Sequence, residues 1–351
     1  SAFTLGFEGT MGDWIIDPKI SYSFAEEDDS DNADVTFRND MKDTVGTIEW
    51  SNPQRPTITP SDTSIYSPAE LGFKELEITE NVSKDSELAF SVNAERETDL
   101  GTLKVGFKSK NREKDVDDYI IVYEADTTMA DFDPQTLDWQ FAGQTFSQQA
   151  NPDMIYALRN QLDSLSVDFS NDYARDFVTE EKVNALYIQN TYTFDKGVIV
   201  AGVRYEDTST ESQAFDQDGN QVFAGSNHSF FAPSINVKYF LDDRLQLRGA
   251  IWKGLSRPGF KKTAPKLDYD NDEGDISGSA GNPDLKPYEA INYDLSLEFY
   301  GDDMTFASVG LFRKNIENAI YPKIYKTATF LGVTFNDDVE TWENAQDSTI
   351  N

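Results

Sequence analysis

The chain has 351 residues, and its 63 acidic side chains against 30 basic ones leave a formal charge of −33. It also carries 24 Phe, 16 Tyr and 5 Trp, an aromatic content that argues against simple disorder. The negative charge repels phosphate and so argues against a nucleic-acid partner. With no cysteine and one histidine, the chain cannot build a disulfide or a Cys/His zinc site.

Runs of alternating hydrophobicity predict ten β-strands, each about 10 residues long, the length that crosses a bilayer at a tilt. In one of them, Leu186 and Ile188 share a face opposite Tyr187 and Gln189. The expected strands are 2–8, 13–24, 85–97, 100–112 and 181–194, then runs at 199–206, 234–241, 245–252, 291–299 and 307–311. No run approaches 18 apolar residues, so no transmembrane helix is expected.

Very short turns alternate with long loops between these strands. The short turns lie at 9–12, 98–100, 195–197, 242–243 and 301–303, and the long loops at 25–84, 113–179, 210–229, 257–287 and 317–351. The loops hold 43 of the 63 acidic side chains but only 15 of the 30 basic ones. Aromatic residues flank the tight turns, as in an interfacial girdle: Tyr192, Phe194, Tyr239, Phe240, Phe299 and Tyr300.

This arrangement predicts an all-β fold, an antiparallel up-and-down transmembrane β-barrel with short periplasmic turns and long extracellular loops. The alternative is a soluble β-sandwich, which also alternates and also uses hairpins. Strands of soluble proteins average about 5–6 residues, however, and sandwiches do not separate short from long connections so strictly.

Four motifs occur in order along the chain. They are Ala201–Thr208 (AGVRYEDT), Ser256–Phe260 (SRPGF), Gly281–Pro287 (GNPDLKP) and Gly310–Ile316 (GLFRKNI). Their order and spacing resemble the C-terminal half of the barrel of TonB-dependent outer-membrane receptors, most clearly from about residue 170 to 320. The overall character is nearest to the large proteobacterial receptors linked to oligosaccharide uptake.

The resemblance implies a 22-stranded barrel, a plug that fills its lumen and an N-terminal segment that engages TonB. Ten strands make less than half of such a barrel, and nothing here resembles the plug, the TonB-engaging segment or the closing strands. We therefore expect residues 1–351 to be part of the barrel domain of a receptor in the outer membrane of a Gram-negative bacterium. The implied partners are outer-membrane lipid, an extracellular ligand and, through the missing plug, the TonB complex.

The expected function is TonB-dependent uptake of a large ligand, with an oligosaccharide as the first expectation and a ferric siderophore as the alternative. A hypothesis of another class is a surface scaffold or adhesin that transports nothing. No nucleophile elbow, phosphate-binding loop or metal-histidine motif is present, so an enzyme is not expected.

Aromatic side chains in the expected loops are the candidate ligand contacts, namely Trp139, Phe141 and Tyr269. Exposed rings can stack on sugars, but those of loop 131–147 could equally pack that loop onto itself. Asn151 followed by Pro152 predicts the start of a short helix over 152–165.

Charged residues on the polar side of the strands are expected to face the lumen, where pairing with one another is favoured over ligand contact. They are Arg204, Glu206, Lys238, Arg248, Asp294 and Glu298. No cofactor is expected. Asp268, Asp270 and Asp272 alternate as in a calcium loop, but an EF-hand needs Gly where Glu273 stands and Glu where Ser279 stands. A structural calcium site of another kind stays open, and His228 has no evident partner.

Overall fold

The computed structural model describes the whole chain except residues 40–44, 53–56, 63, 65–66, 137–139, 142–143, 146–147, 160–165, 172–174, 217–218, 273, 347 and 351. The chain divides into two compact units. One comprises residues 1–27, 82–117 and 173–351, and the other comprises residues 28–81 and 118–172. No helix in the described residues is long and apolar enough to cross a membrane.

The described residues form mostly β-strands, and three of the strands exceed 20 residues. The elements are β1 Ala2–Gly6, β2 Gly9–Met11, β3 Trp14–Arg38, β4 Gly46–Glu49, β5 Thr57–Pro60, β6 Gly72–Thr98, β7 Gly101–Glu124, β8 Gln140–Phe141, β9 Gln144–Thr145, α1 Pro152–Arg159, β10 Ser166–Asn171, β11 Phe177–Phe194, β12 Gly197–Phe215, β13 Gln221–Phe240, β14 Leu245–Ser256, α2 Phe260–Thr263, β15 Leu267–Asp272, β16 Asp275–Ala280, β17 Tyr288–Tyr300, β18 Phe306–Glu317, β19 Ile320–Tyr325, β20 Ala328–Phe330, β21 Val333–Phe335, β22 Val339–Asn344 and β23 Ser348–Ile350. Short 3₁₀ turns lie at Pro68–Glu70 and Met129–Phe132.

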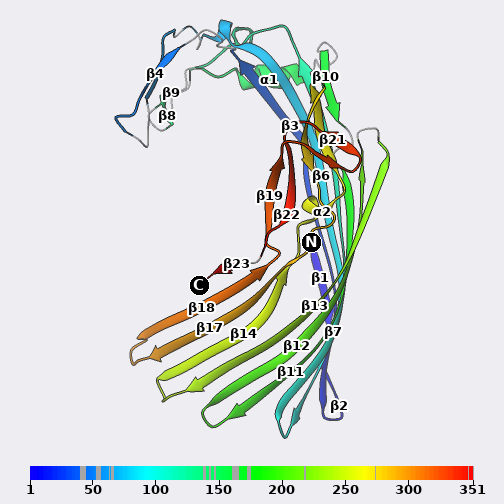
Figure 1. Cartoon of the computed structure of the whole chain (residues 1–351), viewed down its shortest axis with the longest axis vertical. Coiled ribbons are helices and arrows are strands. Elements are labelled where there is room, and N and C mark those ends of the chain that lie inside the picture. Colours follow the sequence, from blue (N-terminus) through cyan, green and yellow to red (C-terminus); the bar gives the residue numbers. More distant parts are fainter. Residues whose placement is uncertain are drawn as a thin grey trace. The chain divides into compact units, whose positions relative to one another are not determined.

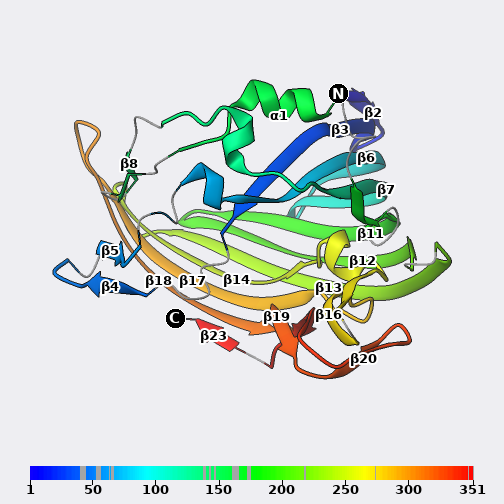
Figure 2. The same ribbon diagram turned by 90° about the horizontal axis from the view of Figure 1, so that it is seen from above.

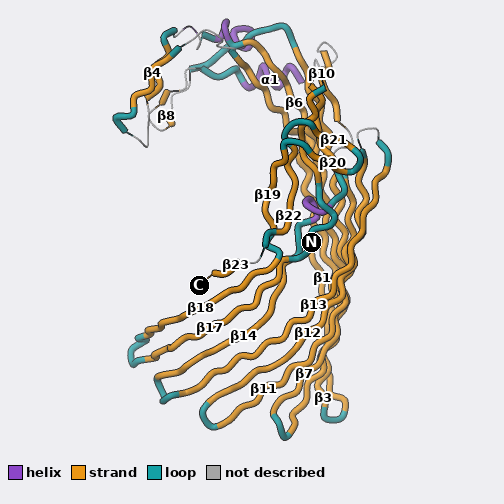
Figure 3. Tube along the Cα trace, in the orientation of Figure 1, coloured by secondary structure: helices purple, strands orange, loops and turns teal. Residues whose placement is uncertain are grey.

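One large sheet contains every predicted strand, in the order β1-β3-β6-β7-β11-β12-β13-β14-β17-β18-β23. Strands β11, β12, β13, β14, β17 and β18 lie side by side in this sheet and are joined in pairs by tight turns at one end (Figures 1, 2 and 3). Their pairings are antiparallel without a break in register, as between β11 and β12 or β17 and β18. The predicted meander of ten strands is confirmed, and β23 adds a short eleventh beside β18.

The two faces of this sheet differ as the alternation predicts. Leu186 is 59% exposed and Leu295 is 47% exposed, and both lie on the face that also carries Ile188 and Ile251. Such a broad exposed apolar surface suits hydrocarbon rather than water. At the tight turns, the Tyr192 and Phe194 rings stack with centroids 6.1 Å apart, in the position expected for an interfacial girdle.

The predicted ends of several strands were wrong, because the strands continue far into the expected loops. Strand β3 has 25 residues, β6 has 27 and β7 has 24, so much of 25–84 and 113–179 is strand. The acidic run Glu26–Asp34 lies within β3. The expected loop 210–229 is reduced to a turn in which Asp216 accepts a hydrogen bond from the Asn220 backbone N–H at 2.8 Å. The charge that we assigned to loops is compatible with strands wherever their backbone lies outside the bilayer.

The loops 257–287 and 317–351 fold together into a small body, here called the loop module. It contains the four-stranded sheet β15-β16-β22-β19 and the hairpin β20-β21. Leu267, Ala280, Phe335 and Val339 form its buried core. These segments were expected to be loops, but their short strands pair their backbone hydrogen-bonding groups and bury their apolar residues.

The second unit has a core of its own around Phe73, Leu76 and Phe132. The helix predicted over 152–165 is confirmed at its start, where the Asn151 side chain accepts a hydrogen bond from the Asp153 backbone N–H at 3.0 Å. Ile155 and Leu158 pack against the core. The rest of the predicted helix, residues 160–165, lies outside the described residues.

Candidate functional site

Charged side chains of β6, β7, β11 and β12 meet on the polar face of the large sheet. Side chains two residues apart share a face of a strand. The register places Glu181 of β11 opposite Arg112 of β7 and opposite Thr210 of β12. Acidic and basic side chains of adjacent strands are therefore neighbours on this face of the sheet.

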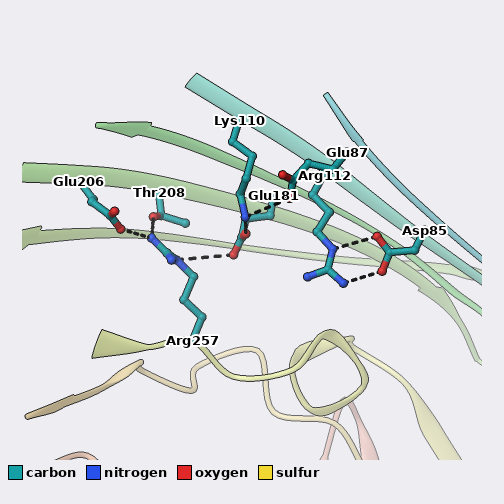
Figure 4. A network of polar contacts seen from close by, with 8 residues as sticks. All are labelled: Asp85, Glu87, Lys110, Arg112, Glu181, Glu206, Thr208 and Arg257. Atoms are coloured by element: carbon teal, nitrogen blue, oxygen red, sulfur yellow. Dashed lines mark hydrogen bonds and ion pairs between the residues drawn. The ribbon is translucent and has the colours of Figure 1, made fainter. Parts of the chain in front are cut away.

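These side chains form a chain of ion pairs from Glu87 through Lys110, Glu181 and Arg257 to Glu206, with a separate Arg112–Asp85 pair beside it (Figure 4). Arg112 donates to both carboxylate oxygens of Asp85, at 2.9 and 2.5 Å. Lys110 lies 3.4 Å from a carboxylate oxygen of Glu87 and 3.4 Å from one of Glu181. The Glu181 side chain is only 6% exposed, so its charge requires this compensation.

Arg257 completes the network from a different part of the chain, the segment that follows β14. Its Nη2 donates to Glu206 Oε2 at 2.6 Å and to Thr208 Oγ1 at 2.9 Å, and its Nε lies 3.6 Å from Glu181 Oε2. Three residues after Arg257, the Phe260 ring packs against the Arg112 guanidinium, whose Cζ lies 5.0 Å from the centroid of the ring. Segment 257–263 is thus held on the polar face by charge and by a cation–π contact.

A cavity of about 330 Å³ lies beside this clamp. Its lining combines charged, polar and proline residues: Glu181, Thr208, Thr210, Gly225, Ser226, Asn227, His228, Arg257, Pro258, Phe260, Thr263, Pro283, Asp284, Leu285, Lys286 and Pro287. The volume is at the lower end of small-molecule sites, so it fits one group of a larger ligand. His228, which had no evident partner in the sequence, lies in β13 with Nε2 3.6 Å from Glu289 Oε1.

The six charged residues predicted to face the lumen lie on the polar face, and most have partners there. Arg204 contacts Glu206 at 2.7 Å, and Arg248 contacts Glu298 at 2.9 Å. The Trp252 indole donates to Asp294 at 3.1 Å. The sixth residue, Lys238, lies opposite Arg248 in the register and over the Phe240 ring. These contacts agree with the expected structural pairing.

The three aromatic ligand candidates are not brought together by any described contact. Trp139 lies outside the described residues, and so does the side chain of Phe141 in β8. Tyr269 of β15 packs edge-on against Phe335 in the loop module, with ring centroids 5.8 Å apart.

The expected calcium residues form one edge of the hairpin β15–β16 rather than a loop. Asp268 is paired with Arg175, whose Nε donates to Asp268 Oδ2 at 2.9 Å. The side chains of Asp270 and Asp272 lie outside the described ones. Among the side chains that are described, no group of three acidic or histidine residues could hold a metal ion.

A second polar cluster ties β19 to β22 within the loop module. Glu343 accepts hydrogen bonds from Tyr325, from Lys323 at 3.3 Å and from Tyr321 at 3.1 Å. These hydrogen bonds, that from the Tyr325 hydroxyl most of all, hold the pKa of the Glu343 carboxyl below its ordinary value. Partial burial of the carboxyl acts in the opposite direction. The same carboxylate raises the pKa of Lys323.

Sequence reasoning missed Arg257 as the clamp and Glu181 as its buried partner. The motif containing Arg257 was noted, but no local spacing links it to strand β11. A signal was present in β7, where basic residues alternate from Lys104 to Lys114 and so share one face.

Solved structures with a similar fold are bacterial outer-membrane receptors. The ferric-catecholate import receptor Fiu of Escherichia coli K12 matches 99% of this chain and 43% of its own, with a TM-score of 0.54 and 11% identity. The siderophore receptor PiuA of Acinetobacter baumannii matches 99% of this chain and 42% of its own, with a TM-score of 0.52 and 12% identity. At such identities the likeness concerns the fold alone.

Two curated relatives align with about half of the chain. One is the probable TonB-dependent siderophore receptor PirA of Acinetobacter baumannii, 26% identical over 173 residues, which are 45% of this chain and 20% of that protein. The other is the iron-regulated outer membrane virulence protein of Vibrio cholerae, 23% identical over 198 residues, which are 52% of this chain and 29% of that protein. The aligned region thus spans less than a third of either relative.

The family described as "TonB dependent receptor-like, beta-barrel" matches residues 13–350, nearly the whole chain. This match agrees with the antiparallel meander, the exposed apolar face and the tight turns described above. The chain therefore belongs to this family of transport receptors, which are not classed as enzymes, and forms part of a β-barrel in the outer membrane of a Gram-negative bacterium.

Proposed function

We propose that this chain is barrel wall of a TonB-dependent receptor that imports a ferric siderophore. The observation that carries the proposal is the similarity of about half the chain to a probable siderophore receptor and to an iron-regulated outer-membrane protein. These names favour the alternative of the sequence analysis over its first expectation, an oligosaccharide. The ligand would be taken up with energy from the TonB complex.

The chemistry of the polar face supports a charged ligand better than a sugar. Sugar sites rely on exposed aromatic rings and neutral hydrogen-bonding groups. Here the described aromatic candidate, Tyr269, is packed in the loop module, whereas the wall is lined by basic and acidic side chains. Iron chelates that carry carboxylate or catecholate groups are anionic, so they call for basic side chains, which the polar face of the wall carries.

Iron uptake by the full-length receptor tests the proposal. The receptor is produced in a strain without siderophore receptors of its own, and uptake of ⁵⁵Fe bound to catecholate, carboxylate and hydroxamate chelators is measured with and without TonB. We expect TonB-dependent uptake of at least one complex, and stronger expression under iron limitation. Growth on oligosaccharides that depends on the receptor, without iron uptake, would support the sugar alternative; binding without any uptake would support a scaffold or adhesin.

A further inference from the structure

Strand β7 carries five basic side chains on the polar face, here called the basic strip. Its members are Lys104, Lys108, Lys110, Arg112 and Lys114. All are an even number of residues apart, so they point to the same side of the sheet. The chain has only 30 basic residues and a charge of −33, so this concentration on one strand is unusual for it.

Four of the five have polar partners. Lys104 lies 3.3 Å from Glu95, Lys110 lies 3.4 Å from both Glu87 and Glu181, Arg112 pairs with Asp85, and Lys114 donates to Ser83. Lys108 is different. Its side chain is exposed and forms no ion pair or hydrogen bond with any residue that the structure describes.

The neighbouring strands explain why Lys108 is unpaired. Across the β7–β11 ladder it faces Ala185, which is 1% exposed. On β6, the residues of the same face between Glu87 and Glu95 are Ala89, Ser91 and Asn93, and none is acidic. Asn93 already accepts a hydrogen bond from the Tyr187 hydroxyl at 2.7 Å. Lys108 is therefore surrounded on the neighbouring strands by uncharged residues, and its ammonium group faces the lumen.

We propose that Lys108 is a contact point for an anionic ferric chelate as it passes through the lumen. This inference rests on the proposed function. Lys108 lies seven residues from the tight turn at 98–101, roughly 24 Å along the strand, so it lies within the wall and below the external loops. Arg257 contacts Glu181, four residues nearer the loops on β11 than Ala185. A chelate that moves past the Arg257 clamp next meets Lys108, which forms no ion pair with the residues that the structure describes.

The test uses the full-length receptor in cells, with two variants of Lys108, one variant on the adjacent strand β6 and one matched control. Lys108→Gln and Lys108→Glu remove or reverse the charge, and Ala89→Glu offers Lys108 a carboxylate on the adjacent strand. Lys182→Gln changes a lysine of β11 whose side chain is 56% exposed and lies on the opposite face. The probes are ⁵⁵Fe complexes of a tris-catecholate, which is anionic, and of a tris-hydroxamate, which is neutral. Labelling of cell-surface receptor normalises the rates.

We expect Lys108→Gln to lower the maximal uptake rate of the anionic complex about 3- to 10-fold, the scale of one partly solvated charge contact, and Lys108→Glu to lower it further. The KM for uptake and the affinity for the complex at the cell surface should stay within about 2-fold of the wild-type values, because both depend on the external loops. Ala89→Glu should behave like Lys108→Gln, and Lys182→Gln like the wild type.

The inference fails alone if the wild type imports the anionic complex and Lys108→Glu imports it at the same rate. It fails as well if the variants slow the neutral complex equally, which would mark Lys108 as a structural residue, or if only the neutral complex is imported. A wild-type receptor that imports no ferric complex removes the proposed function and this inference together.

Discussion

Replacing Arg257 by alanine is expected to release segment 257–263 from the polar face of the wall. The change removes charge-assisted hydrogen bonds to Glu206 and Thr208 and the weaker contact with Glu181. Loss of one partner from a buried ion pair costs roughly 3–5 kcal/mol when the other charge is left alone.

The cost is smaller here because both glutamates keep another cation. Lys110 remains 3.4 Å from Glu181, and Arg204 remains 2.7 Å from Glu206. A hydrogen bond to a charged group contributes about 1.5–3 kcal/mol, so we expect the opening free energy of the segment to fall by about 2 kcal/mol. That corresponds to a roughly 30-fold larger equilibrium constant for opening.

Hydrogen exchange of the full-length receptor, measured by mass spectrometry, reads this opening directly. Amides of segment 257–263 should exchange roughly 30-fold faster in Arg257→Ala, while the wall hairpins keep their protection. Lys182→Ala is the matched control, since the Lys182–Glu180 pair is largely exposed and worth at most about 1 kcal/mol. Equal exchange in Arg257→Ala and the control would refute the clamp.

Three further changes test the loop module. Phe335→Ala empties a fully buried position and should cost about 3–5 kcal/mol, seen as loss of exchange protection in β15, β16 and β22 but not in the wall. Gly281→Ala would place a Cβ 1.9 Å from the Ala264 carbonyl oxygen, so limited proteolysis should cut the module faster than in the wild type. The pKa of the Glu343 carboxyl is lower in the folded state than its unfolded value of about 4.3, so the ionised carboxylate stabilises the fold above that value. This stabilisation is lost as the pH falls through the folded-state pKa. Hydrogen-exchange protection of β19 should therefore decrease below about pH 4, and it should decrease less in Glu343→Gln.

The order and pairing of the wall strands could be predicted because the bilayer forces a strict alternation on them. Leu186, Ile188 and Leu295 face one side, whereas Arg204, Glu206 and Glu298 face the other, so the period of two located the strands. Their extracellular ends could not be predicted. Beyond the bilayer neither face must be apolar, and runs such as Glu26–Asp34 look the same in a strand as in a loop.

The site was predictable in its orientation but not in its contacts. Parity placed Arg204 and Glu206 on the polar face, and their 2.7 Å contact lies within one strand. The Arg257 clamp depends on a segment returning across strands that are distant in sequence, which no local spacing encodes. The loop module escaped prediction for the same reason, since its sheet pairs β16 with β22 from separate loops.

The distribution of charge suggests where an anionic chelate would enter. The segments 25–84 and 113–179 each hold 14 acidic residues, against five and three basic ones, and so repel such a ligand. Segment 257–287 holds six acidic and five basic residues and is nearly balanced. Since charges on the surface are screened over about 8–10 Å, this local balance matters more to an approaching ligand than the total of −33. The segment that repels an anion least is therefore the one that carries Arg257, and its side chain contacts the polar face of the wall that also carries Lys108.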